Sequence, residues 1–101
     1  MTKYNNKITY IDNIRFDSRK EAMRYVYLRE LVKNGTIKNL ELQVAFPFVY
    51  EGKKIFKYVA DFVYEDEFGK HVEDVKGVRT QIFNLKKKLI EAQHKIEIEL
   101  V

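Results

Sequence analysis

The chain has 101 residues, of which 46% are hydrophobic, and a formal net charge of +4. This predicts a single domain over residues 1–101, and the mild positive charge is compatible with a polyanionic partner without requiring one. The absence of Cys excludes disulfides, thiolate metal sites and cysteine catalysis, and no apolar run approaches the ~20 residues of a membrane helix. Residues 1–7 also lack an apolar signal core, so we expect a cytoplasmic protein with no membrane contact.

The N-terminal third predicts a hairpin and a helix. Residues 8–16 form two short apolar runs around a turn at Asp12-Asn13. Ser18-Arg-Lys-Glu21 is a capping-box pattern that begins a helix over about 18–33. Asn34-Gly35 then provides a stop signal, because Gly accepts the left-handed conformation of a helix end.

The rest of the chain predicts a sheet and a second helix. Three strands are expected at Leu42–Tyr50, at about Ile55–Tyr64 and at 70–76, and Pro47 indicates an edge or a bulge. Thr80 can cap a helix over about 80–93, and Lys95–Leu100 alternates as a last strand. Because a strand, a helix and a strand in this order favour a parallel crossover, we predict an α/β (α+β-like) fold. It has a small mixed sheet, a first helix before it and a crossover helix after the third strand.

Two acids and a lysine on neighbouring predicted strands are the most informative residues. Asp61 interrupts an apolar run, and Asp74 and Lys76 lie two apart on the next strand, so they share a face. Pairing across the turn would bring Asp61 near Asp74. Two carboxylates beside a lysine can hold a divalent metal and place a water for phosphodiester cleavage.

Several segments carry a resemblance that covers nearly the whole chain. They are Arg15-Phe-Asp-Ser-Arg-Lys-Glu21, Asn34-Gly-Thr-Ile37, Leu40-Glu-Leu-Gln-Val44, Ala60-Asp-Phe62, Asp74-Val-Lys-Gly77, and Thr80 with Leu85-Lys-Lys-Lys88. In these segments and their order the chain resembles the PD-(D/E)XK nuclease superfamily, and more closely the small phage-encoded proteins of the DUF1064 group. The resemblance implies a restriction-endonuclease-like core and metal-dependent DNA cleavage.

The resemblance also implies roles for single residues. Asp61 matches the superfamily's metal-binding aspartate, Asp74 its D/E position and Lys76 the lysine that orients or activates the attacking water. Glu21 matches an extra acid of resolvase-like branches, and Gln43 falls where relatives carry a further polar residue. Asp61 is preceded by Ala60 and not by the Pro of the motif, a departure that many members share. The implied metal is Mg²⁺, with Mn²⁺ as a substitute, and no small-molecule cofactor is expected.

Each of these residues also has an ordinary explanation. Glu21 could simply return a hydrogen bond to the helix start, and Asp74 with Lys76 could be a surface pair worth ~0–1 kcal/mol. Asp61 is harder to dismiss, because a buried acid needs a partner or a metal. We expect Glu73 to face away from Asp74 into solvent, although a one-residue register slip would exchange their roles.

The remaining polar residues and the aromatic residues carry weaker predictions. We expect the two histidines to be surface residues, and the aromatic residues between 46 and 64 to serve packing. The candidates for DNA contact, besides Gln43, are Gln81, Lys86 and Lys87.

Three classes of function remain open from the sequence. The first is a Mg²⁺-dependent endodeoxyribonuclease of recombination or repair in a bacterial or phage-infected cell, with a Holliday-junction resolvase as a subtype. Two symmetric cuts and the small size of the domain would then favour a homodimer acting on branched DNA. The second is a non-catalytic DNA-binding or phage accessory protein on the same fold, and the third is a protein-interaction module.

Overall fold

The computed structural model describes residues 7–75 and 79–101, and its elements follow the predicted order. A hairpin of β1 (Thr9–Ile11) and β2 (Ile14–Phe16) leads into helix α1 (Arg19–Lys33). The strands β3 (Lys38–Tyr50), β4 (Lys53–Asp66) and β5 (Gly69–Asp74) follow, then helix α2 (Gln81–His94) and strand β6 (Ile98–Leu100). The predicted mixed α/β architecture is confirmed.

Turn and cap residues explain where these elements begin and end. Asp12 and Asn13 both have positive φ, as a tight two-residue hairpin turn requires. Ser18 and Thr80 each accept a hydrogen bond at 3.1 Å from the backbone N–H three residues on, so both helices have the N-cap that the sequence predicts. Gly69 has φ 124°, a conformation that favours glycine, and it begins β5 directly after the turn from β4.

The second sheet has the strand order β3-β4-β5-β6, in which β5 and β6 are parallel and the other pairs are antiparallel. Helix α2 is therefore the predicted crossover helix. Strand β3 is an edge strand with a bulge between Phe48 and Val49, which confirms the prediction from Pro47. Both long strands exceed their predicted bounds, since β3 begins at Lys38 and β4 runs to Asp66.

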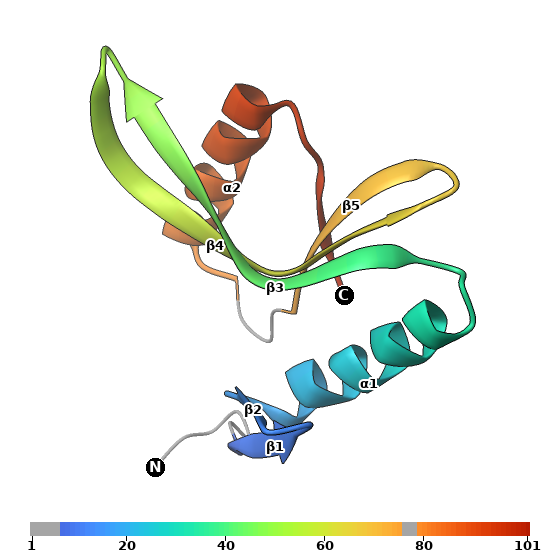
Figure 1. Cartoon of the computed structure of the whole chain (residues 1–101). Coiled ribbons are helices and arrows are strands. Elements are labelled where there is room, and N and C mark those ends of the chain that lie inside the picture. Colours follow the sequence, from blue (N-terminus) through green and yellow to red (C-terminus); the bar gives the residue numbers. More distant parts are fainter. Residues whose placement is uncertain (1–6, 76–78) are drawn as a thin grey trace.

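The two helices cover opposite sides of the bent sheet, each over its own core (Figure 1). The core under α1 includes Leu28, Phe62 and Tyr64, together with Phe16 from the N-terminal hairpin. The core under α2 includes Tyr58 and Ala60 of β4, and Ile90 of α2 itself. Neither described helix has the length and apolar character needed to cross a bilayer.

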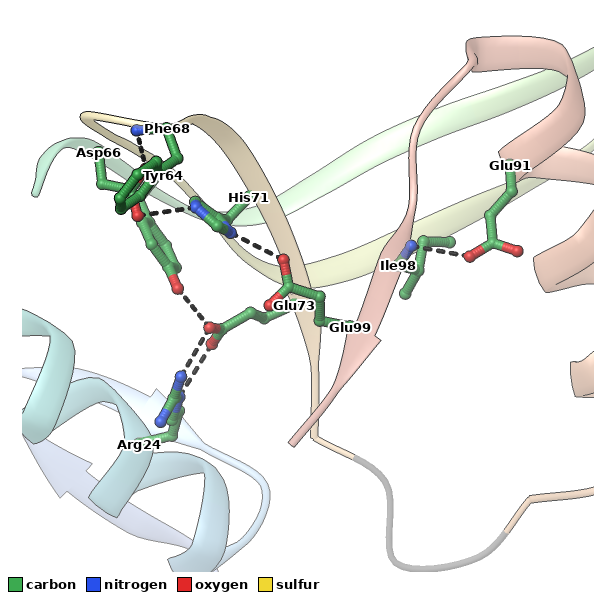
Figure 2. A network of polar contacts seen from close by, with 9 residues as sticks. All are labelled: Arg24, Tyr64, Asp66, Phe68, His71, Glu73, Glu91, Ile98 and Glu99. Atoms are coloured by element: carbon green, nitrogen blue, oxygen red, sulfur yellow. Dashed lines mark hydrogen bonds and ion pairs between the residues drawn. The ribbon is translucent and has the colours of Figure 1, made fainter.

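A buried ion pair fastens α1 to the sheet (Figure 2). Arg24 donates from Nε to Oε1 of Glu73 at 2.9 Å and from Nη2 to Oε2 at 2.6 Å, and the Tyr64 hydroxyl donates to the same Oε2 at 2.5 Å. Glu73 is 1% exposed. The prediction that it faces solvent is therefore wrong, because α1 covers the side of β5 to which Glu73 points.

Both histidines make contacts that the sequence did not predict. The His71 ring stacks on Tyr64 and lies 2.8 Å from a carboxylate oxygen of Asp66 and 2.8 Å from one of Glu99, as Figure 2 shows. The hydrogen bond to Glu99 is the main cause that raises the pKa of His71. His94 lies with Nε2 at 2.7 Å from the carbonyl oxygen of Pro47, so it links α2 to β3. Both side chains are partly exposed, so they lie at the surface as predicted, but each is held by contacts.

Candidate active site

At Gln43 on β3 and Asp61 on β4, the regular alternation of side chains between the two faces of the sheet is interrupted. Residues two apart on a regular strand share a face, yet Leu42 packs in the core under α1 and Val44 packs against the core under α2. On β4, Phe62 likewise packs in the core under α1 and Ala60 in the core under α2. Gln43 has φ 54°, a left-handed conformation that costs a non-glycine residue energy and that clusters at functional sites. The interruption therefore identifies this point as a candidate site.

The strand registers place three polar residues in a row across this point. Leu42 pairs with Phe62 and Val44 with Ala60, so Gln43 lies opposite Asp61. Phe62 pairs with Glu73, so the next position brings Asp61 opposite Asp74. The row Gln43, Asp61 and Asp74 thus crosses three neighbouring strands, and the predicted proximity of the two aspartates is confirmed.

Hydrogen bonds hold this row in place. Asp61 accepts from the Val75 backbone N–H on Oδ2 at 2.8 Å and from Gln43 Nε2 on Oδ1 at 3.3 Å. Asp74, which is 1% exposed, accepts a hydrogen bond from the Tyr58 hydroxyl. The two aspartates are therefore oriented by Gln43, Tyr58 and the backbone of Val75.

Glu21 joins the row from α1. Gln43 Nε2 lies 3.1 Å from Glu21 Oε2, so a single amide connects Glu21 to Asp61. The backbone N–H of Glu21 donates to Ser18 Oγ at the start of the helix. The N–H thus serves the cap while the carboxylate contacts Gln43, which places Glu21 beside the two aspartates.

Burial raises the pKa of Asp61 to about 8. A hydrogen bond with Asp74 and the negative charges of Asp74 and Glu21 act in the same direction, and the Val75 N–H opposes them. The pKa of Tyr58 is also raised, first by burial and then by its hydrogen bond to Asp74. The Asp61 carboxyl therefore holds a proton to a higher pH than a free aspartate does, and a bound cation would compete with that proton.

This shift predicts how stability depends on pH in metal-free buffer. The unfolded chain releases the Asp61 proton near pH 3.8 and the folded chain only near pH 8, so the folded state binds more protons between these values. We expect the free energy of unfolding to fall as pH rises from about 4 to about 8, and to level above it. Urea titrations in EDTA should show a flatter profile for Asp61→Asn, and parallel profiles would contradict the assignment.

The oxygen donors fit a hard divalent cation. Mg²⁺ prefers oxygen ligands and retains several waters, so Asp61 and Asp74 with Glu21 close by make a suitable donor set. The described residues contain no group of three or more acidic, His or Cys side chains already in metal-binding arrangement. Any metal would therefore take its main protein ligands from the aspartate pair and complete its coordination with water.

The other predicted site residues lie on α2, away from the two aspartates, or are not among the residues that the structure describes. Lys76 is not among the described residues. Gln81 is exposed at the start of α2, Lys87 pairs with Glu91 at 3.0 Å, and Lys86 lies 5.3 Å above the Phe56 ring. Of the four residues proposed for DNA contact, Gln43 is thus the one that contacts the acids.

Tyr58 is the site residue that sequence reasoning missed. Its spacing matches that of the packing aromatics, and it is 7% exposed as a core residue would be. Only the approach of β5 reveals that its hydroxyl reaches Asp74. Strand alternation alone could not have separated it from Phe46 or Phe62.

One comparison with known proteins finds a match. A family model described as "Protein of unknown function (DUF1064)" matches residues 1–100. No curated protein and no solved structure matches the chain.

Proposed function

The chain belongs to the DUF1064 family of proteins of unknown function, and we propose that it is a metal-dependent endodeoxyribonuclease of the PD-(D/E)XK type. The observation that carries the proposal is the aspartate pair, in which Asp61 lies opposite Asp74 with a pKa raised to about 8. Two carboxylates this close, one of them 1% exposed, are costly unless a proton or a cation offsets their charge. A cation held by such oxygen donors can polarise a phosphate and lower the pKa of a bound water, which is what phosphodiester hydrolysis needs.

Each residue has a proposed part in the reaction. Asp61 and Asp74 would hold Mg²⁺ or Mn²⁺, which when bound neutralises charge on the phosphate and lowers the pKa of a water. Gln43 orients Asp61 and keeps Glu21 within reach, and Tyr58 orients Asp74. Lys76, two residues after Asp74, would stabilise charge in the transition state, since acids nearby keep a lysine protonated.

The substrate that we propose is DNA, with branched DNA as the form to test first. The domain is small, so two copies acting on one junction would supply both the binding surface and paired cuts. Action on DNA agrees with a cytoplasmic location in a bacterial or phage-infected cell. These proposals on partner and location follow from the proposed activity.

Cleavage assays test the proposal directly. Labelled duplex, single-stranded, flap and four-way-junction DNA would be incubated with the protein in Mg²⁺, Mn²⁺ or EDTA. We expect cutting in either metal and none in EDTA, and the preferred DNA would define the subtype. Binding of DNA without cutting of any form would instead favour a non-catalytic DNA-binding protein, and loss of both would favour a protein partner.

A further inference from the structure

One side of the β3–β4 hairpin is left uncovered beyond the site. From Val44 to Phe48 and from Phe56 to Ala60, every second side chain packs in the core under α2. The residues between them point to the other side and are exposed there: Ala45, Pro47, Lys57 and Val59. Val59 is 37% exposed, and beyond the bulge, next to the turn, Ile55 and Val49 are 53% and 40% exposed. We call these six residues the open face.

The open face is continuous with the candidate active site. It lies on the same side of the sheet as α1, and α1 packs against the other half of the hairpin, which carries Leu42 and Phe62 (Figure 1). Gln43 contacts Glu21 of α1, so these two residues of the site lie on the α1 side. Ala45 pairs with Val59 and Pro47 with Lys57, so the open face ends two residues before Asp61 on β4. A chain lying on Lys57 and Val59 would thus reach the site from the side of Gln43 and Glu21.

The positive charge of the open face favours a negatively charged partner. Lys57 lies among the apolar residues of the open face, none of the six is acidic, and Lys53 and Lys54 are exposed at the adjoining turn. A second copy placed face to face would bring Lys57 near its own counterpart with no acid on either face, which is unfavourable. A polyanion with an apolar side, such as the sugar–phosphate backbone of DNA, complements both properties.

We propose that the open face is the track that holds the DNA flanking the cut, with a phosphate on Lys57 and sugars against Val59 and Ile55. This inference rests on the proposed function and adds where the substrate lies. Lys57 and Asp61 are four residues apart on β4, or about 13 Å at the rise of a strand. With the helix axis of the DNA along β4, a rise of about 3.4 Å per base pair places the phosphate on Lys57 about four nucleotides from the cut.

Binding measured in EDTA tests the track separately from cleavage. We expect Lys57→Glu to weaken affinity for a short labelled duplex about tenfold at moderate salt, and to lower the slope of log affinity against log salt by about 1. Lys88→Glu makes the same charge change at an exposed position on α2 and should leave affinity within twofold. Equal affinity of the Lys57→Glu variant and the unmodified protein, or equal losses in both variants, would overturn the track.

A cross-link supplies a second test that needs no change in charge. The chain has no Cys, so Val59→Cys offers a single attachment point for a photoactivated cross-linker, and Ile82→Cys on α2, where the side chain is 58% exposed, is the control. We expect cross-links to DNA from position 59 and not from position 82. Cross-links from position 59 to a second protein chain would overturn the track in favour of a dimer contact. If the unmodified protein binds in this way without cutting any DNA in Mg²⁺, the proposed activity fails while the track stands.

Discussion

We expect Asp74→Asn to lower the rate of metal-dependent DNA cleavage about a thousandfold, because a bound metal is worth several kcal/mol of transition-state stabilisation and each 1.36 kcal/mol is tenfold. Asp74 lies opposite Asp61 and is 1% exposed. Asn has nearly the same size and can still accept the hydrogen bond of the Tyr58 hydroxyl. The substitution therefore removes a negative ligand while it keeps the packing. Single-turnover cleavage over a range of Mg²⁺ concentrations measures the loss.

Glu73→Gln is the matched control for this variant. Glu73 precedes Asp74 on β5 and is equally buried, but it points to the other side of the sheet and binds Arg24. We expect this variant to retain cleavage within a few-fold while it remains folded, as circular dichroism would verify. A folded Glu73→Gln protein that loses as much activity as Asp74→Asn would contradict the assignment of the two faces. So would an Asp74→Asn protein that cuts at the unmodified rate.

Local rules account for the parts of this fold that the sequence predicts well. Ser18 and Thr80 cap helices because their side chains satisfy the first free N–H groups, whatever the rest of the chain does. Strand alternation with a short turn at Gly69 suffices to bring Asp61 near Asp74. Both inferences depend on neighbours in the chain, so a single sequence contains the information.

The features of the site that the sequence did not predict depend on contacts between segments far apart in the chain. The alternation along β3 and β4 is reversed at Gln43 and Asp61, and no residue type marks that reversal in advance because neither is glycine or proline. The amide that joins Glu21 to Asp61 brings together three elements, each predicted separately. The resemblance, and not the spacing, had pointed to Gln43. Its left-handed backbone and its contacts with two carboxylates are physical evidence that Gln43 belongs to the site.

The burial of Glu73 is the clearest case of a local rule overridden by tertiary structure. Alternation correctly separates Glu73 from Asp74, and the ordinary inference is that the charged residue on the second face meets water. Arg24, 49 residues earlier, instead covers that face with a cation that forms two hydrogen bonds. The error therefore concerned what lies on that face and not the direction of the side chain.

We expect Arg24→Met to lower the free energy of unfolding by about 3–5 kcal/mol. The substitution removes the cation that pairs with Glu73 and leaves the carboxylate buried. Glu73 is 1% exposed, whereas the Arg24 side chain is 28% exposed, so most of the cost falls on the carboxylate. A domain of this size has about 5–15 kcal/mol in total, so the loss is a large fraction of its stability. Urea unfolding at pH 7 measures it.

The double variant Arg24→Met with Glu73→Leu separates the cost of an unpaired charge from the value of the ion pair. Replacing both partners by apolar side chains removes the charge that needs compensation, and such replacements are often neutral or stabilising. We therefore expect the double variant to regain most of the stability that Arg24→Met loses, although the Tyr64 hydroxyl then loses its acceptor. If the free energy of unfolding of the Arg24→Met variant lies within about 0.5 kcal/mol of that of the unmodified protein, the ion pair is not what holds α1 to the sheet. In that case the apolar core under α1 would have to do so unaided.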